Sequence, residues 1–273
     1  MNLFAAKFRL VWIGAAALIL SACNSDTYTE FKDIPTFPPE VLYNQGLALS
    51  NAKNYGAAAK KFETLDRQHP YSSYAKKSLL LAANAHHKTG NYSAAITAGR
   101  RYYALFPKSD DAPYALYLVA ESFYRQIQDV TRDQQESDKA VKVYEELLRE
   151  FPDSEYAPDA KKKIAIATSQ LAGKEMQVGR YYLERENYVA AVNRFKVVVE
   201  DHQQTIHIEE ALMRLAEAYL AMGVVPEAQT AVAVLGHNFP ESEWYKRAYT
   251  LLRNDGLNPK NNDKSWINQS FNS

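Results

Sequence analysis

Between residues 69 and 240 of this 273-residue chain, a proline preceded by phenylalanine or histidine recurs four times, and a serine follows each of these prolines two positions later. Proline stops the helix before it, and a hydroxyl two residues on accepts the free N–H groups that begin the next helix. Each copy therefore predicts a helix, a stop, a cap and another helix. The copies are His69-Pro70 with Ser72, Phe106-Pro107 with Ser109, Phe151-Pro152 with Ser154 and Phe239-Pro240 with Ser242, and a degenerate copy has Gln203 and Thr205 in the two slots.

The residues before these prolines match the tetratricopeptide pattern, a two-helix repeat of about 34 residues. The pattern reserves three slots for a small residue, an alanine and a bulky residue. Small residues let the two helices of a hairpin cross closely, and the bulky residue fills the gap to the neighbouring unit. The triplets are Gly46, Ala58 and Phe62 before Pro70; Ala83, Ala95 and Gly99 before Pro107; Gly179, Ala191 and Phe195 before Gln203; and Ala216, Ala228 and Val232 before Pro240.

The copies are 37, 45, 51 and 37 residues apart, so two units carry insertions. In the first, the polar stretch between Tyr124 and Ala140 has no apolar period and predicts a loop. In the second, residues 159–186 keep a helical period without proline, which predicts one long helix that offers a docking surface. We therefore predict an all-α fold: a right-handed tetratricopeptide-repeat solenoid over residues 40–253, with five helical hairpins and a C-terminal capping helix. Polar residues 254–273 lack a helical period and predict a mobile tail.

The N-terminus is typical of a signal peptide over residues 1–22. Lys7 and Arg9 mark an apolar stretch that rises about 16 Å as a helix, short of the roughly 30 Å hydrocarbon core. The single cysteine, Cys23, ends a Leu-Ser-Ala-Cys sequence that resembles the lipobox of bacterial lipoproteins. The resemblance implies diacylglycerol and N-palmitoyl on Cys23, and Asn24 implies transfer to the outer membrane. Proline-containing residues 23–39 predict a lipidated tether, and a secretory leader with an incidental cysteine is the alternative.

Composition and motifs argue against several classes of function. The 32 basic and 32 acidic residues balance, so a sequence-independent grip on nucleic acid has no electrostatic basis. Hydrolase, zinc-peptidase and nucleotide-binding motifs are absent from the sequence. The histidine groupings, His86-His87 and His202 with His207, are spaced poorly for metal ligands, so a metal site there is the lesser alternative. We expect no enzymatic activity, no metal and no cofactor apart from the covalent lipid.

Nineteen tyrosines are harder to assign to a solvated surface. Most fall at repeat positions and are expected to pack between helices. The others offer rigid area and a hydroxyl at low entropic cost, which suits recognition of extended, aromatic-rich peptides. The candidates for a client-peptide groove, all near the first helices of the early repeats, are Tyr43, Tyr71, Tyr74 and Tyr114.

In this order, the lipobox, tether, five repeats and insertions resemble the BamD family, also called ComL or YfiO. The likeness covers nearly the whole mature chain and is strongest over residues 132–205. It is carried by the loop Thr-Arg-Asp, the run Phe-Pro-Asp-Ser-Glu-Tyr-Ala-Pro-Asp-Ala and the segment Arg-Tyr-Tyr-Leu-Glu-Arg-Glu-Asn-Tyr-Val-Ala-Ala-Val-Asn-Arg-Phe. The resemblance implies a non-enzymatic lipoprotein on the periplasmic face of the outer membrane, within the Bam complex that folds β-barrel proteins.

The resemblance also implies particular partners and residues. The family's C-terminal repeats dock to a POTRA domain of BamA and to companion lipoproteins, and its N-terminal repeats receive C-terminal segments of unfolded outer membrane proteins. Arg132 and Asp133 match the family's loop pair, and Asn193 and Arg194 match the pair turned toward BamA. Gln203 departs from the family, which usually has the repeat proline there. The alternative function is a tetratricopeptide lipoprotein adaptor for envelope division or peptidoglycan synthesis.

Overall fold

The computed structural model describes residues 36–272, and every regular element among them is an α-helix. The signal peptide, Cys23 and nearly all of the tether lie outside the described residues. Residues from Pro38 onward form one compact unit. None of the helices described is long and apolar enough to cross a membrane.

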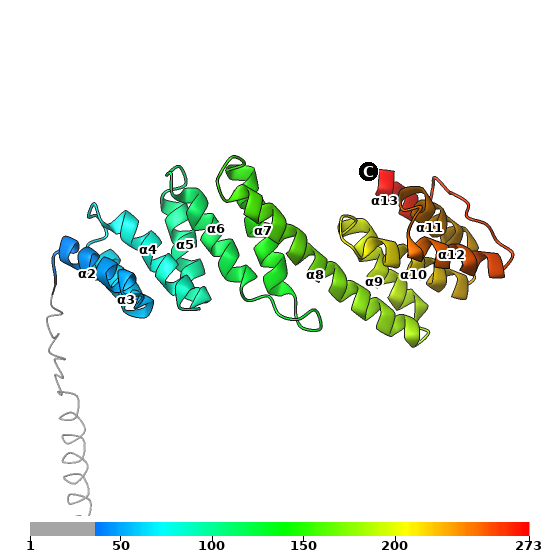
Figure 1. Ribbon diagram of the computed structural model, residues 1–273, viewed down its shortest axis with the longest axis horizontal. Coiled ribbons are helices and arrows are strands. Elements are labelled where there is room, and N and C mark those ends of the chain that lie inside the picture. Colours follow the sequence, from blue (N-terminus) through cyan, green and yellow to red (C-terminus); the bar gives the residue numbers. More distant parts are fainter. Residues whose placement is uncertain (1–35, 273) are drawn as a thin grey trace, which may run out of the picture. The chain divides into compact units, whose positions relative to one another are not determined.

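Ten helices pair into five antiparallel hairpins that follow one another in chain order (Figure 1). Each hairpin packs on its neighbours along the chain, and α12 (Glu243–Asn254) closes the last one against α10 and α11. The predicted all-α architecture of five hairpins and a capping helix is therefore confirmed. The hairpin helices are α2 (Pro39–Asn51), α3 (Tyr55–Gln68), α4 (Ala75–Lys88), α5 (Tyr92–Leu105), α6 (Ala112–Tyr124), α7 (Gln135–Glu150), α8 (Ala157–Glu184), α9 (Tyr188–Asp201), α10 (Ile208–Ala221) and α11 (Val225–Asn238).

Glycine facing phenylalanine sets the spacing inside two hairpins. A Cβ on Gly46 would overlap the ring of Phe62, and a Cβ on Gly179 would overlap the ring of Phe195. Both rings are fully buried, and each also lies in a cluster with residues of the next hairpin. The bulky residue therefore packs against its own hairpin as well as the neighbouring unit.

The predicted serine caps are wrong at most turns. Only Ser242 caps a helix, accepting the Trp244 N–H at 3.1 Å. Ser72 and Ser154 are followed by two further turn residues before the next helix begins, and their hydroxyls make no hydrogen bond to it. The helix caps occur instead at the turn inside a hairpin, where Asn54, Asn91 and Asn187 accept the N–H groups of Ala57, Ala94 and Ala190 at 3.3, 3.4 and 3.3 Å.

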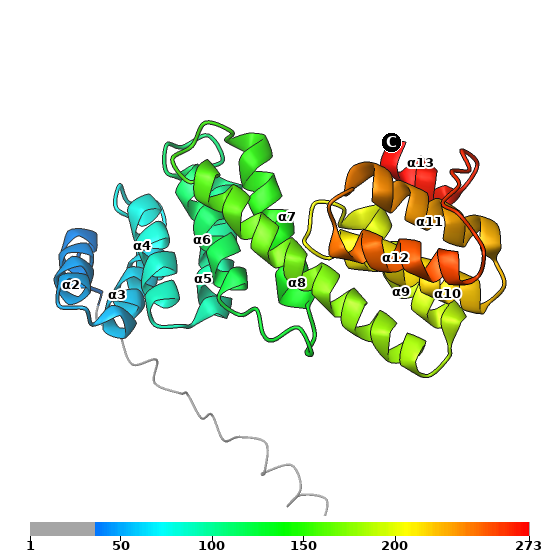
Figure 2. The ribbon, with the colours of Figure 1, turned by 45° about the vertical axis from the view of Figure 1, so that its right-hand side comes forward.

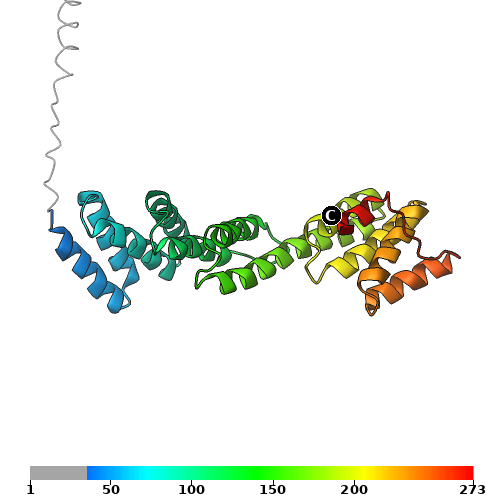
Figure 3. The ribbon, with the colours of Figure 1, turned by 90° about the horizontal axis from the view of Figure 1, so that it is seen from above.

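Both insertions are found where the sequence predicts them. The loop after α6 covers residues 125–134 and ends earlier than expected, because the polar segment from Gln135 already belongs to α7. The long helix is α8, whose 28 residues lead from the third hairpin into the fourth (Figure 3).

A buried network fixes α8 against the third hairpin. Glu121 of α6 is 5% exposed and accepts from Lys163 of α8, from the Tyr144 hydroxyl at 2.9 Å and from Arg125 at 2.8 Å. Burial raises the pKa of the Glu121 carboxyl, but these donors outweigh burial and hold that pKa below its usual range. Lys163 also pairs with Asp159 at 2.8 Å. This network therefore ties together α6, α7 and α8, with Tyr144 as the contribution of α7.

The tail differs from the sequence prediction. Residues Trp266–Asn272 form a helix, α13, which packs on α9 and α11 (Figure 2). Ile267 is fully buried. The tail has few apolar residues and no helical period of its own. It is ordered because it packs on α9 and α11.

Candidate partner-binding surface

One turn of α8 bonds both of the segments that contain the residue pairs assigned to partner binding. The Lys174 ammonium donates to the Thr131 carbonyl at 3.0 Å, in the loop that contains Arg132 and Asp133. The adjacent Glu175 accepts from Arg194 of α9 at 3.1 Å. Two segments some sixty residues apart in the sequence are thus held to the same part of α8. We call this region the α8 surface: the loop 125–134, the middle of α8 and the exposed side of α9.

Local hydrogen bonds give the loop a defined conformation. Asp129 accepts the Thr131 N–H at 2.9 Å, and this bond holds the pKa of the Asp129 carboxyl below its usual range. The side-chain amide of buried Gln134 donates to the carbonyls of Asp129 and Arg132 at 3.0 and 3.2 Å. Asp133 accepts the N–H of Gln135 at 3.2 Å, which helps to begin α7. Arg132 and Asp133 are both exposed, so the loop presents them on a fixed backbone.

Asn193 and Arg194 lie exposed on α9. The Arg194 side chain is 45% exposed and Glu175 is 21% exposed. The Arg194 guanidinium donates to Glu175 through one nitrogen, and an arginine side chain carries five N–H donors in all. Arg194 can therefore keep its bond to α8 and still donate to a carboxylate of another protein.

An open pocket of about 460 Å³ lies between the loop, α8 and the turn before α10. Its lining includes Val130, Ile166 and Ile206, and the last two side chains are 52% and 83% exposed. Sequence reasoning did not single out these apolar residues. The length of the predicted long helix was the sequence signal for them, because extra helical turns without a neighbouring repeat leave apolar side chains uncovered.

Burial favours the neutral form of the histidines near the α8 surface. Burial lowers the pKa of His207, which lies against Gly173 of α8, and burial also lowers the pKa of His202. Elsewhere, His87 accepts or donates a hydrogen bond to Ser122 at 2.9 Å, and His86 pairs with Glu63 at 2.6 Å. Over residues 36–272, no three histidine, cysteine or acidic side chains gather as metal ligands.

The four candidate groove tyrosines fall into three separate environments. Tyr43 of α2 packs on Tyr74, with ring centroids 5.1 Å apart. Tyr114 of α6 bonds Asn84 and lies 5.6 Å from the ring of Tyr156. Tyr71, between α3 and α4, is 99% exposed. Two of the sites are thus ring pairs that hold helices together, Tyr71 is free to meet a ligand, and the groove itself stays a prediction.

Comparison with known proteins gives consistent matches over most of the chain. A family model described as YfiO, outer membrane lipoprotein, matches residues 35–235. The outer membrane protein assembly factor BamD of Caulobacter vibrioides is 43% identical over 222 residues, which are 81% of this chain and 73% of that protein. The factor of the same name from Rickettsia prowazekii is 38% identical over 237 residues, 87% of this chain and 93% of that one. That from Neisseria meningitidis serogroup A is 34% identical over 245 residues, 85% of this chain and 91% of that one.

Proposed function

Because the chain belongs to the YfiO family of outer membrane lipoproteins, we propose that it is a non-catalytic scaffold of the outer membrane β-barrel assembly machinery. The similar proteins named above are outer membrane protein assembly factors, and the chain shares that general role. In this proposal it connects recognition of unfolded outer membrane proteins, on its N-terminal hairpins, to BamA, on its C-terminal hairpins. It is held by lipid at the periplasmic face of the membrane.

The observation that carries the proposal is the convergence on α8. The loop and α9 lie far apart in sequence, yet Lys174 bonds the loop at Thr131 and Glu175 bonds α9 at Arg194. Exposed polar residues beside an open apolar pocket have the makeup of a protein interface, in which apolar area supplies affinity and charged groups supply orientation. We assign the BamA contact to this α8 surface.

Arg194→Glu tests the assignment. Reversing this charge should weaken BamA association roughly tenfold or more, because a carboxylate replaces the donor at the contact. Recovery of BamA with the tagged full-length chain, purified from detergent-solubilised envelope, measures the effect. Arg67→Glu is the matched control, since Arg67 is an exposed arginine on α3 of the first hairpin, and BamA recovery should be unchanged.

A charge swap separates contact with the partner from support of α9. Glu175→Arg combined with Arg194→Glu restores an ion pair between α8 and α9 while keeping the reversed charge at residue 194. BamA recovery should remain low in the swapped chain. Full recovery there, or no loss in Arg194→Glu alone, would remove Arg194 from the interface. Recovery of cell-wall or division proteins in place of BamA would favour the adaptor alternative.

Client capture is assigned to the first two hairpins. Tyr71 supports this assignment, because a nearly fully exposed tyrosine in the turn between two hairpins offers its whole ring to an extended peptide. Tyr43 and Tyr74 would serve by holding the first two hairpins together, and Tyr114 of the third hairpin by holding α6 to Asn84 of α4.

The lipid anchor is tested by Cys23→Ser. Serine does not accept the diacylglycerol, and the chain should then fractionate with the soluble periplasmic proteins, because acyl chains are what holds a lipidated protein on a bilayer. Membrane fractionation followed by immunoblotting checks this. Continued recovery with the outer membrane would reject acylation as the anchor.

A further inference from the structure

Basic and acidic residues are divided unevenly along the chain. Residues 38–108, which cover the first two hairpins and part of the turn after them, contain ten lysines and arginines and three acidic residues. Residues 109–272 contain nineteen and twenty-six. The balanced charge of the whole sequence therefore consists of a positive N-terminal part and a negative remainder, and a positive part attracts an anionic partner.

The acidic residues of the first two hairpins do little to offset this charge. Glu63 pairs with His86 at 2.6 Å, and Asp66 bonds Arg101, so both carboxylates already have a partner within the protein. The third, Glu40, lies in the first turn of α2. The two hairpins as a whole therefore keep an excess of positive charge.

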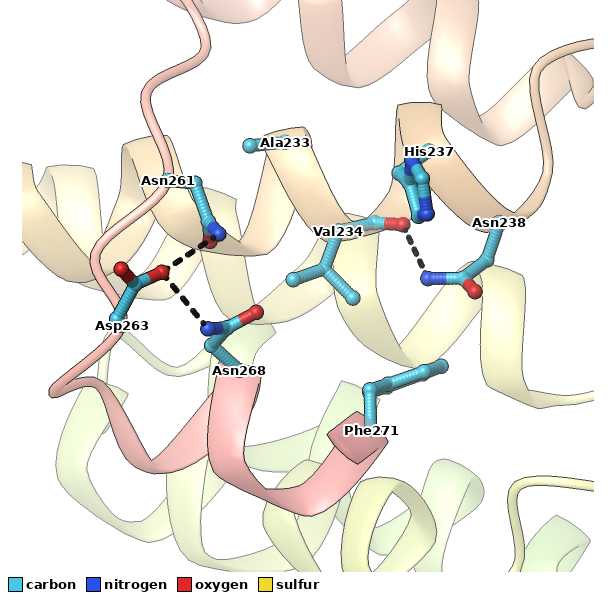
Figure 4. Close-up of a pocket in the computed structure, with 8 residues that line it drawn as sticks. All are labelled: Ala233, Val234, His237, Asn238, Asn261, Asp263, Asn268 and Phe271. Carbon is cyan, nitrogen blue, oxygen red and sulfur yellow. Dashed lines mark hydrogen bonds between the residues drawn. The ribbon is translucent and has the colours of Figure 1, made fainter. Parts of the chain in front are cut away.

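The opposite end of the chain has the contrary character. Eight residues line the open pocket of about 500 Å³ between α11 and the tail, among them Asp263 but no lysine or arginine (Figure 4). Asp263 accepts from Asn261 and Asn268 at 3.2 and 3.3 Å. An anionic surface would find no basic group in this pocket and would bind the first hairpins instead.

Three lysines gather at one end of the first two hairpins. Neighbouring helices run antiparallel, so the start of α2 and the turns after α3 and α5 lie at the same end, the upper one in Figure 1. We call it the tether-side end, because the tether joins α2 there. Lys76 and Lys77 lie at the start of α4, and Lys108 follows α5. Asp110 and Asp111 come directly after Lys108 and mark where the basic part of the chain ends.

The tether-side end also exposes apolar area. Within residues 38–108, the exposed large apolar or aromatic side chains are Val41, Tyr71 and Leu105, which are 39%, 99% and 56% exposed. Val41 lies in the first turn of α2, Tyr71 in the turn after α3, and Leu105 is the last residue of α5. Lysines beside exposed apolar side chains are typical of surfaces that lie on a bilayer, where apolar groups enter the headgroup region and ammonium groups meet phosphates.

We propose that the tether-side end rests on the anionic lipid headgroups of the membrane that carries the chain. This placement depends on the proposed lipid anchor: Pro38 is fifteen residues after Cys23, so α2 stays within about 50 Å of the acylated cysteine. A few lysines and apolar side chains bind a bilayer weakly without acyl chains. The contact therefore orients the repeats, and the Cys23→Ser chain still leaves the membrane. Tyr71, assigned above to clients, would receive them beside the headgroups.

Sedimentation with vesicles tests the contact without the anchor. The probe is the mature polypeptide without acyl groups, residues 24–273, which contains every helix described. It should bind phosphatidylcholine vesicles with about 30 mol% phosphatidylglycerol roughly tenfold or more tightly than vesicles of phosphatidylcholine alone. Salt at about 0.5 M should remove the difference, because it screens the charges.

A pair of double variants separates the surface from net charge. Lys77→Glu with Lys108→Glu should weaken binding to the anionic vesicles roughly tenfold or more. Lys161→Glu with Lys162→Glu is the matched control, since it changes the net charge equally at exposed lysines of α8 and should leave binding unchanged. Equal losses in the two double variants would overturn the proposal.

A second pair of variants tests the apolar part without changing charge. Leu105→Asn should weaken binding to the anionic vesicles roughly threefold or more, because it removes a side chain that enters the headgroup region. Val189→Asn is the matched control at a 65% exposed valine of α9, and its binding should be unchanged. Circular dichroism of each variant verifies that the helices are intact.

Two further outcomes would reject the bilayer as the partner. One is equal binding of the native chain to anionic and neutral vesicles. The other is a chain that ignores anionic vesicles but binds a polyglutamate peptide, which would assign the lysines to an acidic protein. Neither outcome alters the Cys23→Ser test, because the vesicles are bound without acyl groups, so the anchor and the contact can fail separately.

Discussion

At the scale of single residues, close packing of the helices depends on glycines, which have no side chain. Gly46, Gly179 and Gly236 each lie against an aromatic ring that a Cβ would overlap. Interiors are packed so closely that such an overlap must move the ring or the helix. Glycine is a weak helix former, so its use inside helices is explained by the close approach that it permits.

Gly179→Ala should destabilise the chain by about 1–3 kcal/mol, because the added methyl displaces the buried ring of Phe195. Gly56→Ala is the matched control: its Cβ meets only a methyl of Thr89 at 3.9 Å, so it should be neutral or stabilising by up to about 1 kcal/mol. Urea unfolding followed by circular dichroism measures both. Equal free energies of unfolding for the two variants would contradict the packing argument.

At the scale of helices, each hairpin turn has its own chemistry. In three of the five hairpins the inner turn has an asparagine cap, at Asn54, Asn91 and Asn187. The turn between hairpins begins at a proline or its substitute and starts the next helix without a side-chain cap, except at Ser242. A tyrosine follows each of these three asparagines, so the Asn-Tyr pair is the better sequence signal of a helix start.

Asn187→Ala should cost about 1 kcal/mol, because it leaves the Ala190 N–H without its side-chain acceptor. Ser154→Ala should change stability by less, since the Ser154 hydroxyl is buried with no hydrogen-bond partner. Thermal unfolding of the two variants checks the order. A larger loss in Ser154→Ala would restore the serine as the cap.

Elements with a strong local pattern could be predicted, and those made by distant contacts could not. Repeat spacing gave the five hairpins and α8, because their periodicity lies within each segment. The order of α13 depends on Tyr219 and Gln203, which no local pattern in the tail reveals. Arg132 and Arg194 were identified by family resemblance, but the bonds of Thr131 to Lys174 and of Arg194 to Glu175 depend on how the loop and α9 fold back along α8.

At the scale of the molecule, stability should depend on pH through its interior histidines. Burial lowers the pKa of His87, His202 and His207, so the folded chain binds fewer protons there than the unfolded chain. Their contribution to the free energy of unfolding is complete above the ordinary histidine value of about 6.5 and is lost as pH falls below it.

Urea unfolding at pH 7.5, 6.0 and 5.0 should therefore show decreasing stability, with the loss beginning near pH 6.5. His87→Gln should flatten part of this dependence, because glutamine does not titrate and can still bond Ser122. A free energy of unfolding that stays constant from pH 7.5 to 5.0 would contradict the burial of neutral imidazoles.

The docking of α13 also has a consequence for how the chain is completed. Hairpins contact their neighbours along the chain, so each can form soon after its own residues have been made. The bonds from α13 instead reach back 47 residues to Tyr219 and 67 residues to Gln203. They can form only after residues 266–270 have been made, and a chain cut short before α13 would expose the face of α9 and α11 that α13 covers.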